Sequence, residues 1–327
     1  MKLSLRRTWG CFLLLMLAVG LVSTSAAADV PAQSLLSEGR VDVAIADLEQ
    51  HLRAQPNDAQ AYHLLCRAHY SLQQWDKAIS AAQKAVALDP DNSDYHLWLG
   101  RAYGEKAEHS SWFTAIGLAR KVRSEFETSV QLDSRNVAAQ SDLAEFYMEA
   151  PAFLGGGKDK ARAQAQRLST MDPGASHWVK ASLAERDHDY ALAESEYRDA
   201  IQSSGSQAQY WLTLASFYRR RNRLEDMEDA VNRASTAEIN HSEVWVDAAE
   251  ILYRAGRNFP VAIQLLRHYL DSSNTSADAP TFQAHYLLGS ILEKQCDKEA
   301  AAGEYRAALA LAHNFSLAEQ ALVRVSR

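Results

Sequence analysis

The chain has 327 residues, of which 47% are hydrophobic and 23% are charged. With only 14 glycines and 7 prolines, its composition excludes a collagen-like or disordered chain and allows a large helical core. The formal net charge is −7. Because nucleic-acid binding needs concentrated positive charge to neutralise phosphates, this balance argues against a nucleic-acid partner.

The first 28 residues are typical of a signal peptide. Lys2, Arg6 and Arg7 precede an apolar run over residues 11–22, and small residues follow as far as Ala28. The alternative is a retained anchor, but the run is about a dozen residues long, short of the ~20 that span a bilayer. We therefore expect cleavage of residues 1–28, no integral membrane segment in the mature chain, and a periplasmic or secreted protein of a Gram-negative bacterium. Cleavage removes three basic and no acidic residues, which lowers the net charge from −7 to −10.

A repeat near 34 residues organises the rest of the chain. It is clearest in residues 59–92, where Tyr62 and His69 hold the large positions of one helix and Ala78 and Ala82 the small positions of the next. These spacings resemble the tetratricopeptide repeat (TPR), a helix-turn-helix unit in which small residues let the two helices pack closely. The resemblance covers almost the whole mature chain. It implies an all-α, right-handed TPR solenoid of stacked helix-turn-helix pairs.

Residues 29–327 are predicted to form a single solenoid. A partial unit at 31–58 opens with a short helix near Pro31, and an amphipathic segment at 316–325 forms a C-terminal capping helix. Seven full units are predicted between them, at about 59–92, 93–136, 137–173, 174–207, 208–241, 242–275 and 282–314. Cys66 and Cys296 lie 230 residues apart, too far to meet in an elongated stack, so we expect no disulfide between them.

Two units carry extra residues between their paired helices, at 105–120 and 150–158. Ser111 is placed to cap a long helix that runs to about Leu132. Because the turns within TPR units emerge on one edge of the stack, we expect the two insertions to be neighbours. Their apolar residues either pack on one another or form a ledge for a partner. These residues are Trp112, Phe113, Ile116, Phe153 and Leu154.

A third excess, residues 271–280, is polar and is expected to be a solvated connector between units. The segments AEHSS (107–111) and EAPAFLGGGKDKA (149–161) together also resemble a group of exported bacterial TPR proteins to which no activity is assigned.

The glycines before Lys158 suggest a phosphate-binding loop, but the motif requires a glycine at the position of Ala152 and a Ser or Thr at that of Asp159. No strand is expected before the loop, so nucleotide binding is not predicted. The eleven histidines are scattered, and the chain has no His-Glu-x-x-His, Cys-x-x-Cys or Gly-x-Ser-x-Gly motif. We expect no catalytic residues, no metal site and no cofactor.

The concave face, lined by the first helix of each unit, is the remaining candidate site. Arginine binds carboxylates through two parallel hydrogen bonds and tyrosine offers rigid contact area, so this face suits an acidic, extended peptide. The alternative is an ordinary solvated surface. The residues expected to point inward are His63, Arg67, Tyr70, Arg101, Glu145, Trp178, Arg186, Leu212, Arg219, Arg220, Tyr253 and Arg254.

The sequence therefore favours an exported, non-enzymatic scaffold that binds protein or peptide partners on its concave face. The alternative is a structural docking subunit of a cell-envelope assembly that uses the edge insertions at 105–120 and 150–158.

Overall fold

The computed structural model describes residues 29–237 and 242–327, and this part of the chain contains seventeen α-helices and no strand. The all-α prediction is confirmed. The predicted signal peptide, residues 1–28, and the end of the unit predicted at 208–241 lie outside the described residues. Within the described ranges no helix is both long and apolar enough to cross a membrane.

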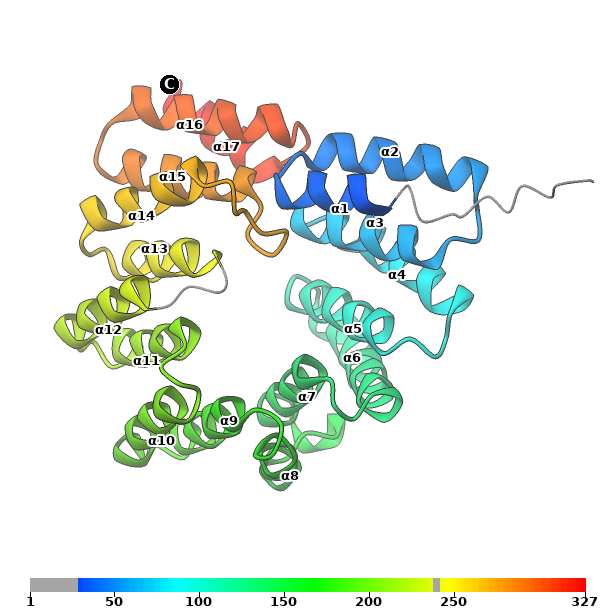
Figure 1. The fold of residues 1–327 in the computed structure, drawn as a ribbon, viewed down its shortest axis with the longest axis vertical. Coiled ribbons are helices and arrows are strands. Elements are labelled where there is room, and N and C mark those ends of the chain that lie inside the picture. The colour runs from blue at the N-terminus through cyan, green and yellow to red at the C-terminus, as the bar shows by residue number, and fades with distance from the viewer. Residues whose placement is uncertain (1–28, 238–241) are drawn as a thin grey trace, which may run out of the picture.

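The helices follow one another as antiparallel pairs (Figure 1). Their bounds are α1 (Asp29–Ser37), α2 (Val41–Ala54), α3 (Ala59–Ser71), α4 (Trp75–Leu88), α5 (Ser93–Glu108), α6 (Trp112–Leu132), α7 (Val137–Glu149), the short 3₁₀ helix η2 (Ala152–Leu154), α8 (Lys158–Leu168), α9 (Pro173–Arg186), α10 (Tyr190–Ser203), α11 (Ala208–Arg220), α12 (Leu224–Thr236), α13 (Val244–Ala255), α14 (Phe259–Asp271), α15 (Thr281–Lys294), α16 (Lys298–Leu311) and α17 (Ser316–Val325).

Short polar side chains fix where the first helices of successive pairs begin. Asp58, Asn92, Asn136 and Asp172 precede α3, α5, α7 and α9, and each accepts a hydrogen bond from a backbone N–H of the first turn. Pro173 follows the last of these caps at a position where no backbone donor is needed.

The turn between the two helices of a pair repeats the same backbone geometry. One residue in each of six such turns has a left-handed backbone, with φ between 57° and 72°. Gly39 and Gln73 lie 34 residues apart, and so do His188, Asn222 and Gly256 in succession; Cys296 is the sixth. The period seen in the sequence is therefore also a period of the backbone.

Small residues set the spacing between paired helices, as the repeat pattern predicts. Ala78 of α4 is fully buried. At Gly100 of α5, a Cβ atom would lie 2.5 Å from the ring of Phe126, and at Gly289 of α15 it would lie 2.7 Å from the ring of Tyr305. Because neither distance leaves room for a side chain, these glycines allow the paired helices to approach closely.

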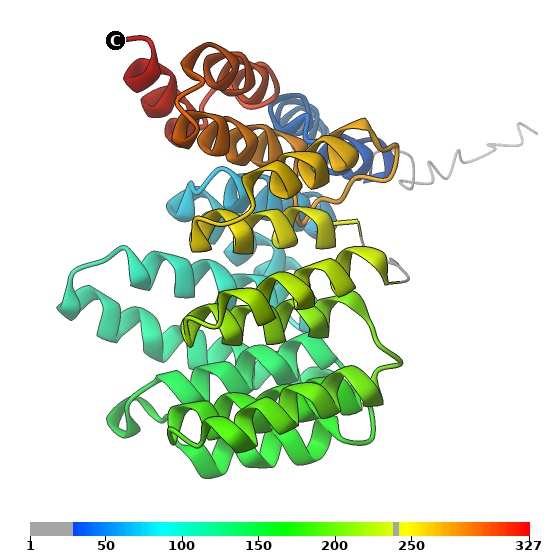
Figure 2. The same cartoon turned by 90° about the vertical axis from the view of Figure 1, so that its left-hand side faces the viewer.

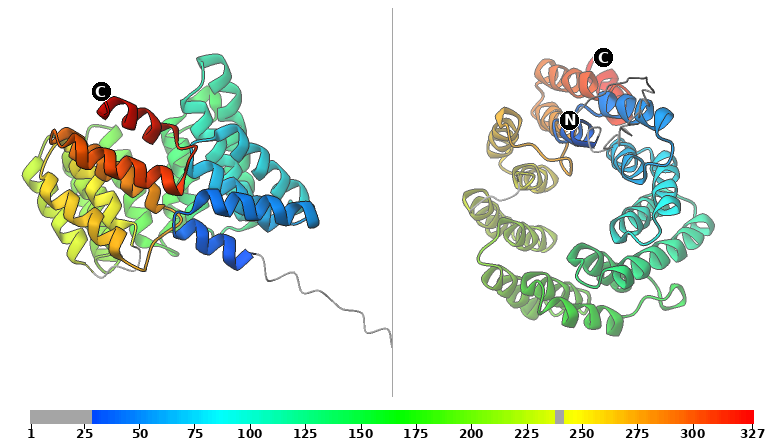
Figure 3. Two further views of the ribbon diagram at one scale, coloured as in Figure 1. Left: turned by 90° about the horizontal axis from the view of Figure 1, so that it is seen from above. Right: turned by 45° about the vertical axis from the view of Figure 1, so that its right-hand side comes forward.

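The stack curves until its two ends meet, so the described chain forms a closed ring (Figures 1 and 3). Thr281 at the start of α15 donates to the carbonyl of Glu38 at 2.7 Å, and Gln283 donates to the carbonyl of Ser71 at 2.7 Å. Buried residues of the first and last units also share one core cluster, which includes Ala32, Leu36, Val41, Phe282, Ala312 and Phe315. Ring closure was not predicted from the sequence.

The loop at 271–280 connects two units and is largely open to solvent, as predicted, but it also takes part in this closure. Asp278 pairs with Arg67 of α3 at 2.7 Å. The Tyr269 hydroxyl holds the loop by donating to the carbonyl of Ala279 at 2.5 Å and accepting from the backbone N–H of Ser276 at 2.8 Å. Asp278 of the loop thus forms an ion pair with a residue of another unit.

Cys66 and Cys296 are both free, as predicted, although the reason given was wrong because the ends of the stack do meet. Cys66 is buried in α3, and this burial raises the pKa of its thiol to about 12. Cys296 is exposed in the turn after α15.

Candidate functional site

The inner face of the ring is built from the first helices of the pairs. Figure 1 shows α5, α7, α11 and α13 nearer the middle than their partners α6, α8, α12 and α14. The predicted concave residues lie on these inner helices and on α3 and α9.

Acidic neighbours neutralise most of the predicted inner arginines. Of the six, five form ion pairs: Arg67 with Asp278 (2.7 Å), Arg101 with Asp142 (2.6 Å), Arg186 with Glu149 (3.4 Å), Arg220 with Glu185 (2.7 Å) and Arg254 with Glu250 (2.6 Å). Arg219 has no ion-pair partner among the described residues, and its Nε atom is buried without a hydrogen bond. The inner face is therefore less basic than the arginine count suggests.

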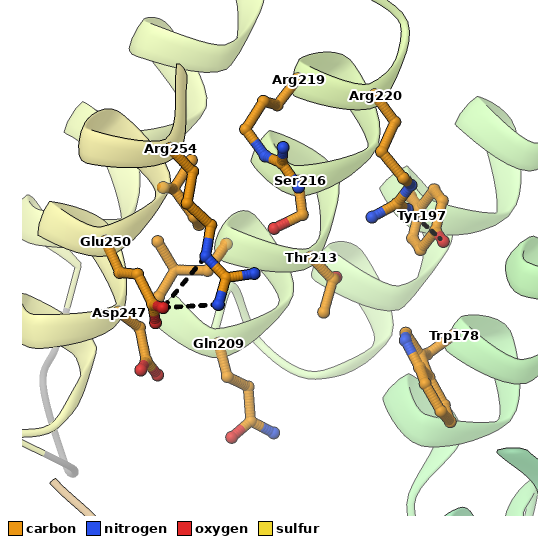
Figure 4. Close-up of a pocket in the computed structure, with 12 residues that line it drawn as sticks. Trp178, Tyr197, Gln209, Thr213, Ser216, Arg219, Arg220, Asp247, Glu250 and Arg254 are labelled. Atoms are coloured by element: carbon orange, nitrogen blue, oxygen red, sulfur yellow. Dashed lines mark hydrogen bonds and ion pairs between the residues drawn. The ribbon is translucent and has the colours of Figure 1, made fainter. Parts of the chain in front are cut away.

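Arg219 lines a cavity of about 410 Å³ between α9, α11 and α13, which we call the arginine pocket (Figure 4). Trp178 stands across the cavity from the arginines in Figure 4, and Leu212, which also lines the cavity, is buried. The lining residues are Trp178, Tyr197, Gln209, Leu212, Thr213, Ser216, Arg219, Arg220, Asp247, Glu250, Ile251 and Arg254.

Ion pairs shape the charge of the arginine pocket. Arg220 donates two hydrogen bonds to Glu185, at 2.8 and 2.7 Å. Burial raises the pKa of Glu185, but these bonds outweigh it and hold that pKa below its usual value. Arg254 likewise donates twice to Glu250, at 3.0 and 2.6 Å. Both guanidinium groups are thus already engaged.

Asp247 lines the arginine pocket with part of its side chain exposed, and the rest is desolvated by burial. This desolvation, with repulsion from Glu250 and Glu243, raises the pKa of Asp247 to about 7. A large fraction of the Asp247 carboxyl is therefore neutral near neutral pH, which reduces its repulsion of an incoming anion.

A second inner cavity, of about 530 Å³, lies between α5, α6 and α7, and we call it the acidic pocket. Three predicted groove residues, Tyr70, Arg101 and Glu145, lie here and not with the other arginines. Desolvation, together with the neighbouring Asp142, Glu149 and Glu108, raises the pKa of Glu145 to about 7. The carboxylates that line this cavity are Glu105, Glu108, Asp142, Glu145 and Glu149. The predicted single groove is therefore two cavities of different charge.

Other predicted groove residues pack against neighbouring aromatic side chains. His63 is buried, with its ring 5.1 Å from that of Tyr95 and 6.0 Å from that of Trp98, so its placement on the open face was wrong. Arg67 and Arg101 hold their guanidinium groups 4.9 and 5.1 Å from the centre of the Trp98 ring.

Tyr70 and Tyr253 are also engaged within the fold. The Tyr70 hydroxyl donates to Glu105 at 3.1 Å, and the Lys294 ammonium lies 4.3 Å from the centre of the Tyr253 ring.

Several pocket residues were missed from the sequence. Gln209, Thr213 and Ser216 precede Arg220 on the same face of α11, and Asp247 and Glu250 precede Arg254 on α13. Their spacings of three and four residues are the signal that would have found them.

The apolar residues of the edge insertions are partly buried and partly exposed. The long helix predicted after Ser111 is α6, and Arg123 of that helix donates to the carbonyl of Leu154 at 3.1 Å. Leu154 is buried and Ile116 half-buried, whereas Trp112, Phe113 and Phe153 are 65%, 87% and 62% exposed. Arg123, which follows the first insertion on α6, thus contacts the second insertion, and the aromatic tips of both insertions lie in solvent.

The glycine stretch is a tight turn. The backbone N–H groups of Gly155, Gly156 and Gly157 each donate to a carbonyl of the same turn or of α7, at 2.8 to 3.2 Å. At Gly156, a Cβ atom would lie 2.6 Å from the carbonyl carbon of Ala150 and closer still to its oxygen. Since all three amides are used, the turn offers no cradle for a phosphate.

His177, Glu196 and Asp199 bring three potential metal-ligand atoms within 4.8 Å of one another. His177 bonds Glu196 at 2.7 Å, and His285 bonds Glu304 at the same distance and the same 19-residue separation. The contact is therefore a recurring bond between paired helices.

Comparison with known proteins agrees with this architecture. Two tetratricopeptide repeat family models match the chain, one over residues 35–102 and the other over residues 246–314. A search of curated proteins finds no match.

Similar solved structures include two other repeat proteins. One is a thermophilic TPR protein of Thermus thermophilus, with 20% identity, 58% of this chain and 98% of that chain covered, and a TM-score of 0.48. The other is from Parabacteroides merdae, with 16% identity, 82% and 100% coverage, and a TM-score of 0.41. The repeated helix pairs, the recurring left-handed turn and the two family matches identify the chain as a tetratricopeptide repeat protein.

Proposed function

We propose that this protein is a non-enzymatic scaffold that binds an extended, acidic segment of a partner protein in the arginine pocket. TPR solenoids present a curved surface to partner proteins, and this supports a role in protein–protein interaction. Arg219 carries the finer proposal, since it is the one predicted inner arginine without an ion pair in the described chain and it lines a cavity with Trp178.

The chemistry of the pocket fits such a segment. A carboxylate of the peptide satisfies the guanidinium of Arg219, while Trp178 offers a large, rigid contact area. Gln209, Thr213 and Ser216 line the same cavity and supply hydrogen-bonding groups for the peptide backbone.

Peptides selected from a random display library on the purified protein should be enriched in Asp and Glu. An Arg219→Gln variant should bind a selected peptide about 10- to 100-fold more weakly, because a hydrogen bond to a charged group is worth about 1.5–3 kcal/mol. Fluorescence anisotropy with the labelled peptide measures this loss.

Arg233→Gln is the matched control, since Arg233 is half-exposed on the outer helix α12 and pairs with Asp229. It should leave the affinity unchanged. Equal affinities for wild type and Arg219→Gln, or selection of peptides without acidic residues, would contradict binding in the arginine pocket.

We also propose that the protein is exported to the periplasm. The supporting observation is the charged, apolar and small-residue order of residues 1–28. Mass spectrometry of the protein from its host should show a mature N-terminus near residue 29, and an intact first residue would reject cleavage.

A further inference from the structure

Two neighbouring turns on one edge of the ring project aromatic side chains into solvent. The α5–α6 hairpin protrudes from this edge, and the α7–α8 turn lies next to it (Figure 2). α5 and α6 have 16 and 21 residues, whereas most other helices have 11 to 14. Trp112 and Phe113 lie at the hairpin tip and Phe153 lies in the second turn; we call these three residues the edge patch.

The backbone beneath the edge patch is firmly held. Leu154 is buried directly after Phe153, and Arg123 donates to the Leu154 carbonyl. Lys160 donates to the carbonyl of Gly155 at 2.7 Å. The exposure of Phe153 is therefore a property of a well-bonded turn.

Positive charge accompanies the edge patch in a chain whose net charge is −7. Residues 109–123 contain Arg120, Lys121 and Arg123 and no carboxylate. Residues 150–162 contain three more cations against a single acid, Asp159.

Not all of this charge is free. Lys158 pairs with Asp187, Arg162 with Asp159 and Arg123 with Glu127, and Glu108 stands just before the first stretch. Arg120, Lys121 and Lys160 remain exposed. These three side chains give the edge exposed positive charge, and the carboxylates of the acidic pocket lie beside them, since Pro151 and Leu154 of the same turn line that cavity.

The spacing of these groups matches the layers of a membrane surface. Arg120 follows Trp112 by eight residues, which places it about 12 Å behind the tip along α6. Interfacial apolar groups enter a bilayer by ~5–10 Å, and a basic residue near an anionic leaflet contributes about 1 kcal/mol. Aromatic side chains at the tip and cations behind them would therefore occupy the interfacial and headgroup layers together.

The edge patch is smaller than a stable protein interface requires. The three aromatic side chains are about two-thirds exposed, so together they present roughly 400 Å² of accessible surface. A typical stable interface buries ~800 Å² on each partner. We propose that this edge is a peripheral membrane contact, in which Trp112, Phe113 and Phe153 enter the interfacial layer of a bilayer while Arg120, Lys121 and Lys160 meet anionic headgroups.

Vesicle flotation tests this proposal. The purified protein should float with vesicles of phosphatidylcholine and phosphatidylglycerol, and about a hundredfold less with phosphatidylcholine alone, because three cations lose about 1 kcal/mol each. A Trp112→Ser/Phe113→Ser variant should lose binding to the anionic vesicles by about tenfold or more. An Arg120→Glu/Lys121→Glu variant should lose the preference for phosphatidylglycerol.

The matched control is Leu192→Ser/Val323→Ser, because these side chains are also 48% and 54% exposed but lie on α10 and α17. This control should bind as wild type does. All variants keep the same N-terminus, so any contribution of residues 1–28 is common to them.

Equal binding to both vesicle types, or unchanged binding of the edge variant, would overturn the proposal. It would also be overturned if wild type ignored vesicles while the edge substitutions abolished self-association or capture of a protein, since the edge would then be a protein interface. None of these residues lines the arginine pocket, so the two proposals fail separately.

Discussion

A Gly39→Ala variant should open the ring and lower the free energy of unfolding by about 2–4 kcal/mol. Gly39 has a φ of 72°, a conformation that costs alanine energy. Its Cβ atom would also lie 2.7 Å from the backbone nitrogen of Thr281, and closer to the hydroxyl of that residue. Since Thr281 starts α15, relief of the clash must push the last unit away from the first.

Gly256→Ala separates backbone strain from ring opening. Gly256 occupies the same turn position with a φ of 66°, but a Cβ atom there would meet nothing within 4 Å. It should lose only about 1–2 kcal/mol and keep the ring closed. Urea denaturation measures the stabilities, and small-angle X-ray scattering should show a larger radius of gyration for Gly39→Ala alone. If the two variants behave alike in both measurements, Thr281 does not hold the ring closed through this contact.

Closure also bears on the inner face. Arg67 reaches across the junction to Asp278 while its guanidinium packs on Trp98, which in turn packs beside Tyr70 at 5.4 Å. The junction is thus connected to the aromatic side chains near the acidic pocket. A ring held at both ends presents its inner face in one fixed curvature, which lowers the entropy lost when a peptide binds.

The repeats could be predicted because their signals are local. Asn and Asp caps, buried alanines and the helix from Trp112 to Leu132 each depend on residues within a few turns of one another. Closure depends on small rotations that accumulate over all units, and no short stretch encodes them. The contact of the polar loop at 271–280 with the first units was missed for this reason, since its partner Arg67 lies 211 residues away.

The candidate site was predicted by position but not by charge. The inner arginines were found from the repeat phase, but several of their partners come from neighbouring units: Asp142 lies 41 residues after Arg101, and Glu185 lies 35 residues before Arg220. A search for carboxylates about one repeat away would have found the partners of Arg101, Arg186 and Arg220, but not those of Arg67 and Arg254. Glu185 lies 34 residues before Arg219 and 35 before Arg220, so spacing alone would not have shown which of the two arginines it pairs with.

Acidification should destabilise the protein through His63, which is buried on α3. Burial, with repulsion from Arg67, lowers the pKa of His63 to about 4 from its usual 6.5. Between pH 6.5 and pH 4, His63 is protonated in the unfolded chain but stays neutral in the folded chain. The contribution of His63 is therefore complete above about pH 6.5 and is lost as the pH falls towards 4.

A His63→Phe variant should remove this part of the pH dependence, because it keeps an aromatic ring against Tyr95 and Trp98 but cannot bind a proton. Between neutral pH and about pH 4, wild type should lose up to about 3 kcal/mol more stability than the variant. Urea denaturation across this range measures the free energy of unfolding of both proteins. Because Glu145 and Asp247 titrate in both, their contributions cancel when the variant is subtracted from wild type. His188→Gln removes an exposed histidine and should keep the wild-type slope. Parallel curves for wild type and His63→Phe would mean that the folded protein accommodates a charged His63, and that the first inner helix is less tightly packed than its buried histidine indicates.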